Sequence, residues 1–308
     1  MEAAALDSAT LETGSPIMGA GTSRTFLQAI ELTEVDGPAD RSFEATTQYV
    51  PWPKAYGGDM VAQAAAAMMR TADADRALHS MHSYFMRPVD IGAPVRYDVE
   101  VLRDGRGYST RSVRAVQGGK TAFAAMGSFQ VPEEGPDFQQ PAPAAVEPAS
   151  LETAAAALAG TAGPAAEYWA HGRSFDMRHV PGPVYIETDG GAVPAQAVWV
   201  KAFDALPDAA DAKATADLHR TALAYVCDYT ILETLLRVRG LHWSSPHLAT
   251  ASLDHAMWFH RDGRADEWVL YAQDAVSGQS NRGLALGRFF DRSGRLLATV
   301  AQEGMIRG

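Results

Sequence analysis

The chain lacks several features that define protein classes. Cys227 is the single cysteine among 308 residues, which excludes an internal disulfide and a cysteine-rich metal site. No segment reaches the about 18 consecutive apolar residues that a membrane-spanning helix requires. Basic residues are scarce relative to acidic ones, 26 against 37, and the formal charge is −11. We therefore expect neither nucleic acid nor an anionic membrane as a partner, because both bind cationic surfaces.

Familiar chemical motifs are missing as well. The chain contains neither the G-x-S-x-G elbow of a serine nucleophile nor the H-E-x-x-H zinc motif. Gly105-Arg106-Gly107 lacks the third glycine of a dinucleotide-binding loop. We therefore expect no metal and no cofactor, although a few local arginines can hold a phosphate-bearing small molecule.

The composition is that of a globular protein with room for two domains. Hydrophobic residues make up 47% and charged residues 20% of the chain. Residues 1–24 are small and polar, and we expect a flexible tail there. This segment has no basic stretch before an apolar run, so it does not resemble a signal peptide, and we expect a cytoplasmic protein.

One pattern occurs twice along the chain. Arg87, Arg106 and Gly119 each begin a turn-like pair of residues, and similar pairs recur 174, 176 and 175 residues later, at Arg261, Arg282 and Gly294. Nearly constant offsets across three turns indicate an internal duplication. The sequence therefore predicts two units of the same fold, at 25–131 and 171–308, joined by a Pro- and Ala-rich linker at 132–170.

Each unit reads as one helix followed by an antiparallel meander. In the first unit, we expect one or two strands around Thr25 to Val50, entered at Phe26, and then a helix that opens at Gly57-Gly58. Period-two alternation predicts strands at 97–101, 108–116 and 121–131. In the second unit, we expect a helix at 222–237 that stops at Gly240, and strands at 175–180, 197–203, 250–260, 267–274, 282–291 and 295–305.

A helix laid across an antiparallel sheet, twice in one chain, predicts an α+β fold. A lone sheet of this kind would expose its edges, so we expect the two sheets to join edge to edge into one extended sheet. The broad faces of such a sheet favour self-association as a homodimer or homotetramer, and the sequence does not distinguish the two.

Three polar residues of the second unit stand on faces that should pack inward. Asp228 shares a helical face with Leu232 and Leu235, and Gln302 alternates in phase with Val300. A buried carboxylate needs partners. Simpler interpretations stay open for all three: a helix-start aspartate for Asp228, a core amide for Gln302 and an ordinary strand serine for Ser252.

The neighbouring Cys227 is not expected to be reactive. A thiol that is buried beside a carboxylate has its pKa raised, which is the opposite of activation. We therefore interpret Cys227 as a packing residue.

Several strings resemble the type II acyl-CoA thioesterases, which are double hotdog proteins. In the first unit these are 78–88 (LHSMHSYFMRP), 97–105 (YDVEVLRDG), the hairpin pair Gly119-Lys120 and 128–130 (SFQ); in the second they are 253–261 (LDHAMWFHR) and 301–304 (AQEG). The resemblance runs from about Trp52 to Gly308, with a poor match at 132–170. It implies two helix-wrapped sheets joined into one, and hydrolysis of acyl-CoA thioesters to a free acid and coenzyme A.

The resemblance also implies site residues. The family's catalytic Asp, Thr or Ser, and Gln fall on Asp228, Ser252 and Gln302 of this chain. The positions that match Ser252 and Gln302 in the first unit are Leu78 and Gly127, which would leave that unit without the chemistry. Where the family often has Gln after the glycine pair, this chain has Asp59, which we interpret as a helix-start residue near the substrate.

The mechanism we expect is direct attack by water. Asp228 would act as general base, while Ser252 and Gln302 would orient the water. Backbone N–H groups near Gly58 would receive the oxyanion, and the Met- and Ala-rich helix after Gly58 would line the acyl tunnel. Arg282 is a candidate contact for the coenzyme A phosphates. The alternatives are a non-catalytic acyl-CoA binding protein and a hotdog enoyl-CoA hydratase. The preferred acyl chain, the pathway and any regulation are not predictable from the sequence.

Overall fold

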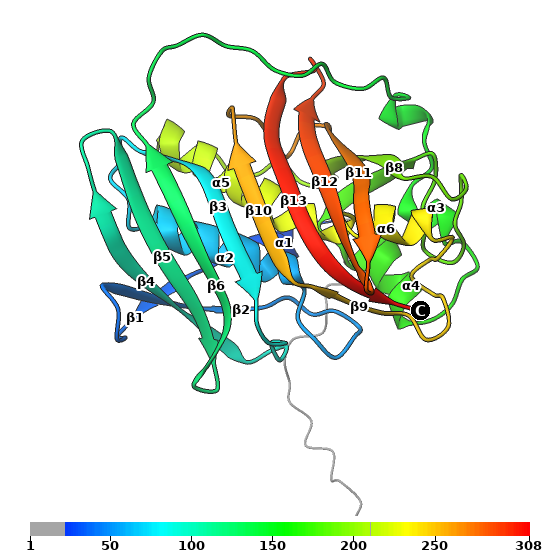
Figure 1. Ribbon diagram of the computed structural model, residues 1–308, viewed down its shortest axis with the longest axis horizontal. Coiled ribbons are helices and arrows are strands. Elements are labelled where there is room, and N and C mark those ends of the chain that lie inside the picture. The colour runs from blue at the N-terminus through cyan, green and yellow to red at the C-terminus, as the bar shows by residue number, and fades with distance from the viewer. Residues whose placement is uncertain (1–21, 210) are drawn as a thin grey trace, which may run out of the picture.

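A single extended sheet dominates the structure. The computed structural model describes residues 22–209 and 211–308, and Figure 1 views them with the sheet in front of the main helices. Within these residues, 13 strands form one sheet in the order β1-β2-β4-β5-β6-β3-β10-β13-β12-β11-β8-β7, and β9 pairs with β13. All of the pairings are antiparallel, which confirms the predicted α+β class with two joined sheets.

The first unit supplies one half of this sheet. Its elements are α1 (Arg24–Ala29), β1 (Thr33–Val35), β2 (Arg41–Thr46), α2 (Gly57–Met69), β3 (Ala77–Phe85), β4 (Pro94–Asp104), β5 (Tyr108–Gln117) and β6 (Lys120–Gln130). Gly118 and Gly119 both have positive φ between β5 and β6, so the predicted two-residue hairpin is confirmed.

The second unit supplies the other half. Its elements are β7 (Phe175–Val180), β8 (Ala195–Ala202), α5 (Ala212–Val226), the 3₁₀ turn η3 (Cys227–Tyr229), α6 (Glu233–Val238), β9 (Ala249–Ser252), β10 (Asp254–Phe259), β11 (Val269–Gln279), β12 (Arg282–Asp291) and β13 (Leu296–Arg307). Between the units lie η1 (Pro148–Ser150), α3 (Ala154–Ala157), α4 (Pro164–Glu167) and the π-helical turn η2 (Tyr168–Gly172).

The strand registers confirm the internal repeat. Arg111 on β5 pairs with Gly127 on β6, and Ala285 on β12 pairs with Gln302 on β13. These pairs are separated by the same offsets that the turns suggested from the sequence. The halves meet where β3 pairs with β10, with Met81 opposite Met257. The two units therefore share one continuous sheet.

The alanine run of α2 explains how the first half closes around its helix. Ala62, Ala64, Ala65 and Ala67 have no exposed surface, and Met60 and Met68 are buried beside them. Small side chains let the helix backbone lie close to the sheet. α2 also packs along α5, so the two central helices lie side by side behind the sheet.

The second helix is interrupted where the sequence predicted it to be continuous. α5 ends at Val226, η3 follows, and α6 begins only at Glu233. Thr230 leaves helical geometry with φ −131°, and its hydroxyl accepts a hydrogen bond from Gln273 Nε2 at 2.7 Å. The predicted stop at Gly240 is correct, because this residue has φ +66°. Because of this interruption, Asp228 lies in the turn between α5 and α6, and its side chain points toward the sheet.

Two predictions for the N-terminal region need correction. The expected entry into a strand at Phe26 is wrong, because Phe26 lies in α1, where it packs edge-on against Phe175 and Tyr225. The two strands expected before Val50 are present as β1 and β2. Residues 1–21 of the predicted tail lie outside the described residues. Ser23, however, is fully buried, and its N–H donates to Asp204 at 2.8 Å, so chain order begins before residue 25.

The segment that joins the two units is packed against the second unit. It arcs over the upper edge of the sheet in Figure 1. Trp199 donates its indole N–H to the carbonyl of Val146 at 2.8 Å, and Ala142 and Leu151 pack on a small cluster around Trp199 and Phe290. In the described part of the chain, no helix combines the length and apolarity needed to cross a bilayer.

Candidate active site

Asp228, Ser252 and Gln302 meet at one point of the structure. Gln302 Nε2 lies 2.7 Å from Asp228 Oδ1 and 2.9 Å from Ser252 Oγ. Ser252 Oγ donates to the same carboxylate oxygen at 3.2 Å. Asp228 comes from η3, Ser252 from the end of β9, and Gln302 from the inward face of β13. The predicted convergence of the three side chains is therefore confirmed, although Asp228 does not begin a helix.

The carboxylate of Asp228 combines burial with several donors. Burial raises its pKa to about 6, while the hydrogen bonds from Gln302, Ser252 and the backbone N–H of Gly58 act in the opposite direction. Asp228 and Ser252 keep partial solvent access, whereas Gln302 has none. Such a carboxylate is ionised near neutral pH and basic enough to accept a proton from water.

The start of α2 faces this carboxylate from the first unit. A Cβ atom placed on Gly57 would lie 2.6 Å from Asp228 Oδ2 and 3.2 Å from the ring of Phe85. A Cβ atom on Gly58 would lie 2.3 Å from the carbonyl oxygen of Tyr225. Only glycine permits so close an approach of the helix backbone. The N-terminal N–H groups and positive dipole end of α2 are thereby held beside Asp228.

His255 was not predicted, although it contacts the trio. Its Nδ1 lies 2.8 Å from Gln302 Oε1, and its Nε2 lies 3.7 Å from Cys227 Sγ. Burial lowers the pKa of His255 to about 4, so the ring is neutral. Burial and Asp228 raise the pKa of the Cys227 thiol well above its usual range, as predicted. The sequence feature that could have identified His255 is the alternation along β10, which places this side chain on the inward face.

The corresponding sheet positions of the first unit are apolar. Leu78 is buried, and a Cβ atom on Gly127 would lie 3.0 Å from Met68 and 3.1 Å from Leu78. These two positions therefore offer no hydroxyl or amide, as the repeat predicted. The first unit therefore repeats the fold around these positions but lacks the polar side chains of the second unit.

Asp59 has partners that the repeat did not predict. Its carboxylate accepts the backbone N–H of Gln48 at 2.9 Å and the Gln48 side-chain amide at 3.3 Å. The same amide approaches the hydroxyl of Tyr229 at 3.5 Å. Asp59 is fully buried, and this burial raises its pKa to about 8. Asp59 lies in the first turn of α2, as predicted, and its raised pKa makes it a neutral acid at pH 7. No sequence pattern marked Gln48.

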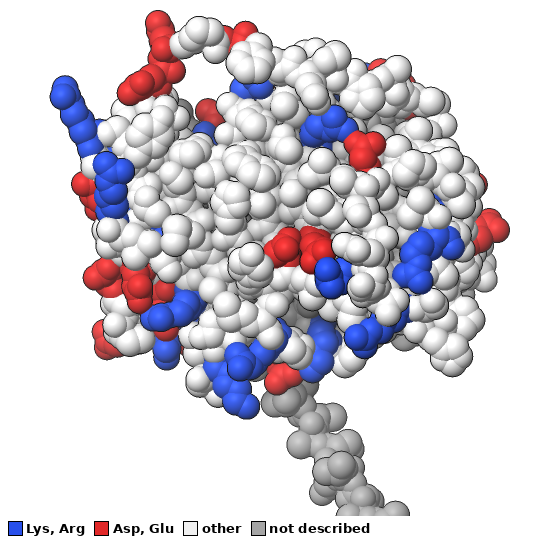
Figure 2. Space-filling view, in the orientation of Figure 1, with Lys and Arg blue, Asp and Glu red and all other residues white. Residues whose placement is uncertain are grey.

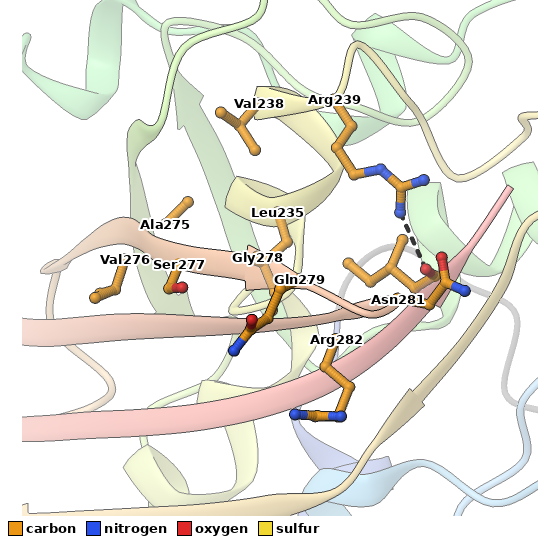
Figure 3. A pocket seen from close by; sticks show the side chains of 12 residues that line it. Leu235, Val238, Arg239, Ala275, Val276, Ser277, Gly278, Gln279, Asn281 and Arg282 are labelled. Carbon is orange, nitrogen blue, oxygen red and sulfur yellow. Dashed lines mark hydrogen bonds between the residues drawn. The ribbon is translucent and has the colours of Figure 1, made fainter.

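Arg282 lines a groove at the far end of β13. Figure 3 shows Leu235 and Val238 of α6, with Arg239 just after its end, on one side, and the β11–β12 hairpin with Gln279 and Arg282 on the other. The cavity volume is about 520 Å³. Its floor includes Ile306, which lies on the same inward face of β13 as Gln302. Its only charged lining residues among those described are Arg239 and Arg282.

The two arginines of this groove have different partners. Arg282 Nε lies 3.2 Å from Glu303, and its side chain is 45% exposed. Arg239 donates to the carbonyl oxygens of Ile306 and Gly308, at 3.0 and 3.2 Å. In a protein of net charge −11, the groove is locally cationic over an apolar floor. Within the described ranges, no cluster of three or more His, Cys, Asp or Glu residues is placed to hold a metal ion.

Comparisons with known proteins agree with this architecture. A family model described as acyl-CoA thioesterase matches residues 172–305, and one described as acyl-CoA thioesterase N-terminal domain matches residues 48–130. Acyl-CoA thioesterase 2 of Haemophilus influenzae is 34% identical over 285 residues, covering 90% of this chain and 96% of that protein. Acyl-coenzyme A thioesterase 8 of Homo sapiens is 34% identical, with coverages of 86% and 84%.

Solved structures show the same similarity. The crystal structure of an acyl-CoA thioesterase II, TesB2, from Mycobacterium marinum is 32% identical, with a TM-score of 0.71 and coverages of 91% of this chain and 97% of that chain. A tesB protein of Mycobacterium avium subspecies paratuberculosis is 30% identical, with a TM-score of 0.73 and coverages of 94% and 100%. The chain therefore belongs to the acyl-CoA thioesterase family and has the double hotdog fold that the resemblance predicted.

Proposed function

We propose that the protein hydrolyses acyl-CoA thioesters to a free carboxylic acid and coenzyme A, with Asp228, Ser252 and Gln302 as catalytic residues. The observation that carries the proposal is the convergence of a carboxylate, a hydroxyl and an amide, with distances of 2.7 to 3.2 Å, in a chain of this family. The site needs no cofactor for this reaction, because a thioester carbonyl is already activated toward water.

The hydrogen bonds support specific roles for the three residues. Both N–H hydrogens of Gln302 are used, one on Asp228 and one on Ser252, and the Ser252 hydroxyl donates to Asp228 Oδ1. Asp228 Oδ2 and one lone pair of Ser252 Oγ are left to accept hydrogen bonds. A water that donates to both would turn a lone pair toward the thioester carbon. Asp228 would take its proton, a contribution of roughly 10²–10⁴ in rate.

The start of α2 would stabilise the oxyanion. The Gly58 N–H already donates to Asp228, so the oxyanion would be met by the Gly57 N–H and by the positive dipole end of α2. Asp59 lies one residue further on, and its neutral carboxyl adds no second negative charge near Asp228. We therefore assign Gly58 and Asp59 to the substrate side of the site, with Asp59 as an uncharged neighbour.

The groove between α6 and the β11–β12 hairpin would bind the rest of the substrate. Arg282 and Arg239 suit the phosphates of coenzyme A, because guanidinium groups recognise phosphate oxygens. The apolar floor of Leu235 and Ile306 suits uncharged portions of the molecule. Along α2 from Met60 to Met68, every residue except the partly exposed Ala66 is buried. We therefore favour the groove, and not α2, as the place that binds the length of the substrate.

The reaction is tested with purified protein, acyl-CoAs of several chain lengths and a thiol-detecting reagent. We expect release of coenzyme A, and a loss of roughly 10²-fold or more in kcat for Asp228→Asn. Asp254→Asn is the matched control, since this carboxylate lies next to the site but bonds the Glu303 N–H at 3.0 Å. Binding without turnover would indicate an acyl-CoA binding protein, and a change at the double bond of an enoyl-CoA would indicate a hydratase.

We also propose a homodimer or homotetramer in the cytoplasm, with independently recognisable units at 25–131 and 171–308. A second copy of the chain suits the outer sheet face, where Tyr84 and Met126 are more than half exposed. Figure 2 shows this face largely uncharged between its margins, apart from small groups of charges above and just below its centre. The single, buried Cys227 suits a reducing compartment. Light scattering of Met126→Lys, which should dissociate the assembly, tests the interface.

A further inference from the structure

The orientation of the Gln302 amide decides whether the trio has its hydrogen bonds. With Nε2 toward Asp228 and Ser252, the amide donates to both; if the amide turned over, its oxygen would face the carboxylate oxygen at 2.7 Å. A carboxylate cannot donate a hydrogen bond, so that arrangement would lose the contact with Asp228 and be repulsive there. Something must therefore hold the carbonyl end of this amide in place.

The imidazole of His255 is placed to do this. We propose that His255 is a positioning residue, whose Nδ1–H holds Gln302 Oε1 and thereby aims the Gln302 amide at Asp228 and Ser252. The two atoms are 2.8 Å apart, and His255 is 1% exposed. The inference rests on the proposed function for its kinetic consequence, but the geometry it describes is independent of the reaction.

The tautomer follows from what surrounds the ring. Oε1 of Gln302 can only accept, so Nδ1 must carry the hydrogen of the neutral imidazole. Nε2 is then bare and faces Cys227 Sγ at 3.7 Å. Because the Cys227 thiol keeps its proton, it can donate weakly to Nε2 or to the carbonyl oxygen of Ala224, which lies 3.2 Å from Sγ. Cys227, His255 and Gln302 thus form a chain that leads to the carboxylate.

The backbone of His255 is fixed separately. Ser83 on β3 donates its hydroxyl to the His255 carbonyl oxygen at 3.0 Å, across the seam between the two halves of the sheet. The first unit therefore contributes to the site through this seam. Substituting the imidazole leaves the Ser83 contact in place, so a variant of His255 changes chiefly the ring's hydrogen bonds.

Two substitutions separate the positioning role from simple packing. An asparagine places its amide nitrogen near the former Nδ1, whereas a glutamine places its nitrogen near the former Nε2. His255→Asn should therefore retain most of the wild-type kcat for an acyl-CoA that the wild type turns over. His255→Gln should lose about 10- to 100-fold in kcat with KM little changed, because a misaimed catalytic group costs rate more than binding. Equal losses in both variants, at matched thermal stability, would overturn the inference.

The pH profile supplies a second readout. Loss of the Gln302 donor removes one of the contacts that lower the pKa of Asp228, so the acidic limb of kcat/KM should move to higher pH in His255→Gln but not in His255→Asn. Four titratable groups face this carboxylate: Tyr56 beside α2, Asp59 on α2, Cys227 on its own turn and Tyr271 on β11. His255 on β10 contacts it only through Gln302. None of the other four is altered by either substitution.

A measurement without substrate keeps the inference separable from the proposed function. In protein labelled with ¹⁵N-glutamine, the Gln302 side-chain signals can be identified by their absence in Gln302→Leu. We expect two distinct, slowly exchanging protons in the wild type and in His255→Asn, and faster exchange in His255→Gln. Unchanged signals in all three proteins would refute the positioning role even if the protein hydrolyses acyl-CoA. The expected signals without any hydrolysis would support it and refute the proposed function.

Discussion

Replacing Asp59 by asparagine should stabilise the protein at neutral pH. The folded state holds this carboxyl fully buried with a pKa of about 8, whereas its ordinary value is 3.8. Between these values the unfolded chain has an ionised Asp59 and the folded chain a protonated one. Folding therefore takes up a proton, and stability falls as the pH rises through this window. The contribution of Asp59 to the free energy of unfolding is therefore largest below about pH 4, and it reaches its lowest value above about pH 8.

The magnitude follows from the size of the pKa shift. Each pH unit inside the window corresponds to about 1.4 kcal/mol, so at pH 7 the wild type should have lost about 4 kcal/mol of its stability at pH 4 through this group. Asparagine has the shape of the neutral acid and does not titrate. The stability difference between Asp59→Asn and the wild type should be near zero at pH 4 and grow steadily toward pH 8.

Urea unfolding at a series of pH values measures this difference. Asp98→Asn is the matched control, because Asp98 is also buried but is bonded to Arg96 and Ser42, both at 2.8 Å, and its pKa is lowered. That variant should lose stability at neutral pH and approach the wild type in acid, the opposite sign. A difference for Asp59→Asn that does not change between pH 4 and pH 8 would refute the reasoning.

Three further predictions concern the site. Gly57→Ala should reduce kcat by at least tenfold, because its Cβ would lie 2.6 Å from Asp228 Oδ2 and displace this side chain. Gly58→Ala should cost more stability than Gly57→Ala in urea unfolding, about 1–3 kcal/mol, because its Cβ would overpack the Tyr225 backbone and the Tyr56 ring. The reverse pattern would contradict the placement of α2. The value of kcat/KM should rise tenfold per pH unit below about pH 6 and be constant above it, since Asp228, whose pKa is about 6, must be ionised to act as base. A profile that is flat from pH 4 to pH 8 would exclude Asp228 as the general base. Arg282→Ala should raise KM for acyl-CoA several-fold with kcat nearly unchanged, and this rise in KM should be smaller at high salt. The control is Arg292→Ala, because Arg292 is an exposed arginine that is paired with Glu147. Equal effects of the two substitutions on KM would argue against phosphate binding in the groove.

Much of the fold was predictable because its signals are local. Alternation over 108–116 and 282–291 gave strands that the structure places at Tyr108–Gln117 and Arg282–Asp291. Glycine pairs marked hairpins, and the constant offset linked the halves. The interruption at Cys227–Tyr229 was missed because apolar periodicity continues across it, and only long-range contacts such as Gln273 to Thr230 reveal it.

The candidate site was predictable in part. The resemblance supplied Asp228, Ser252 and Gln302, whose side chains do meet, while their catalytic role stays a prediction. Gln48 and His255 escaped because their importance depends on which carboxylate or amide the fold brings to them. Asp59 lies in the first turn of α2, as predicted, but the sequence did not reveal that burial raises its pKa and makes this carboxyl a neutral acid.

The measurement that tests the central claim most directly is mass spectrometry of the intact protein, quenched rapidly during steady turnover of an acyl-CoA. If a water activated by Asp228 attacks the thioester, the protein should keep its unmodified mass at every time point while coenzyme A accumulates. An acyl group found covalently attached to Ser252 or Asp228 would contradict the account.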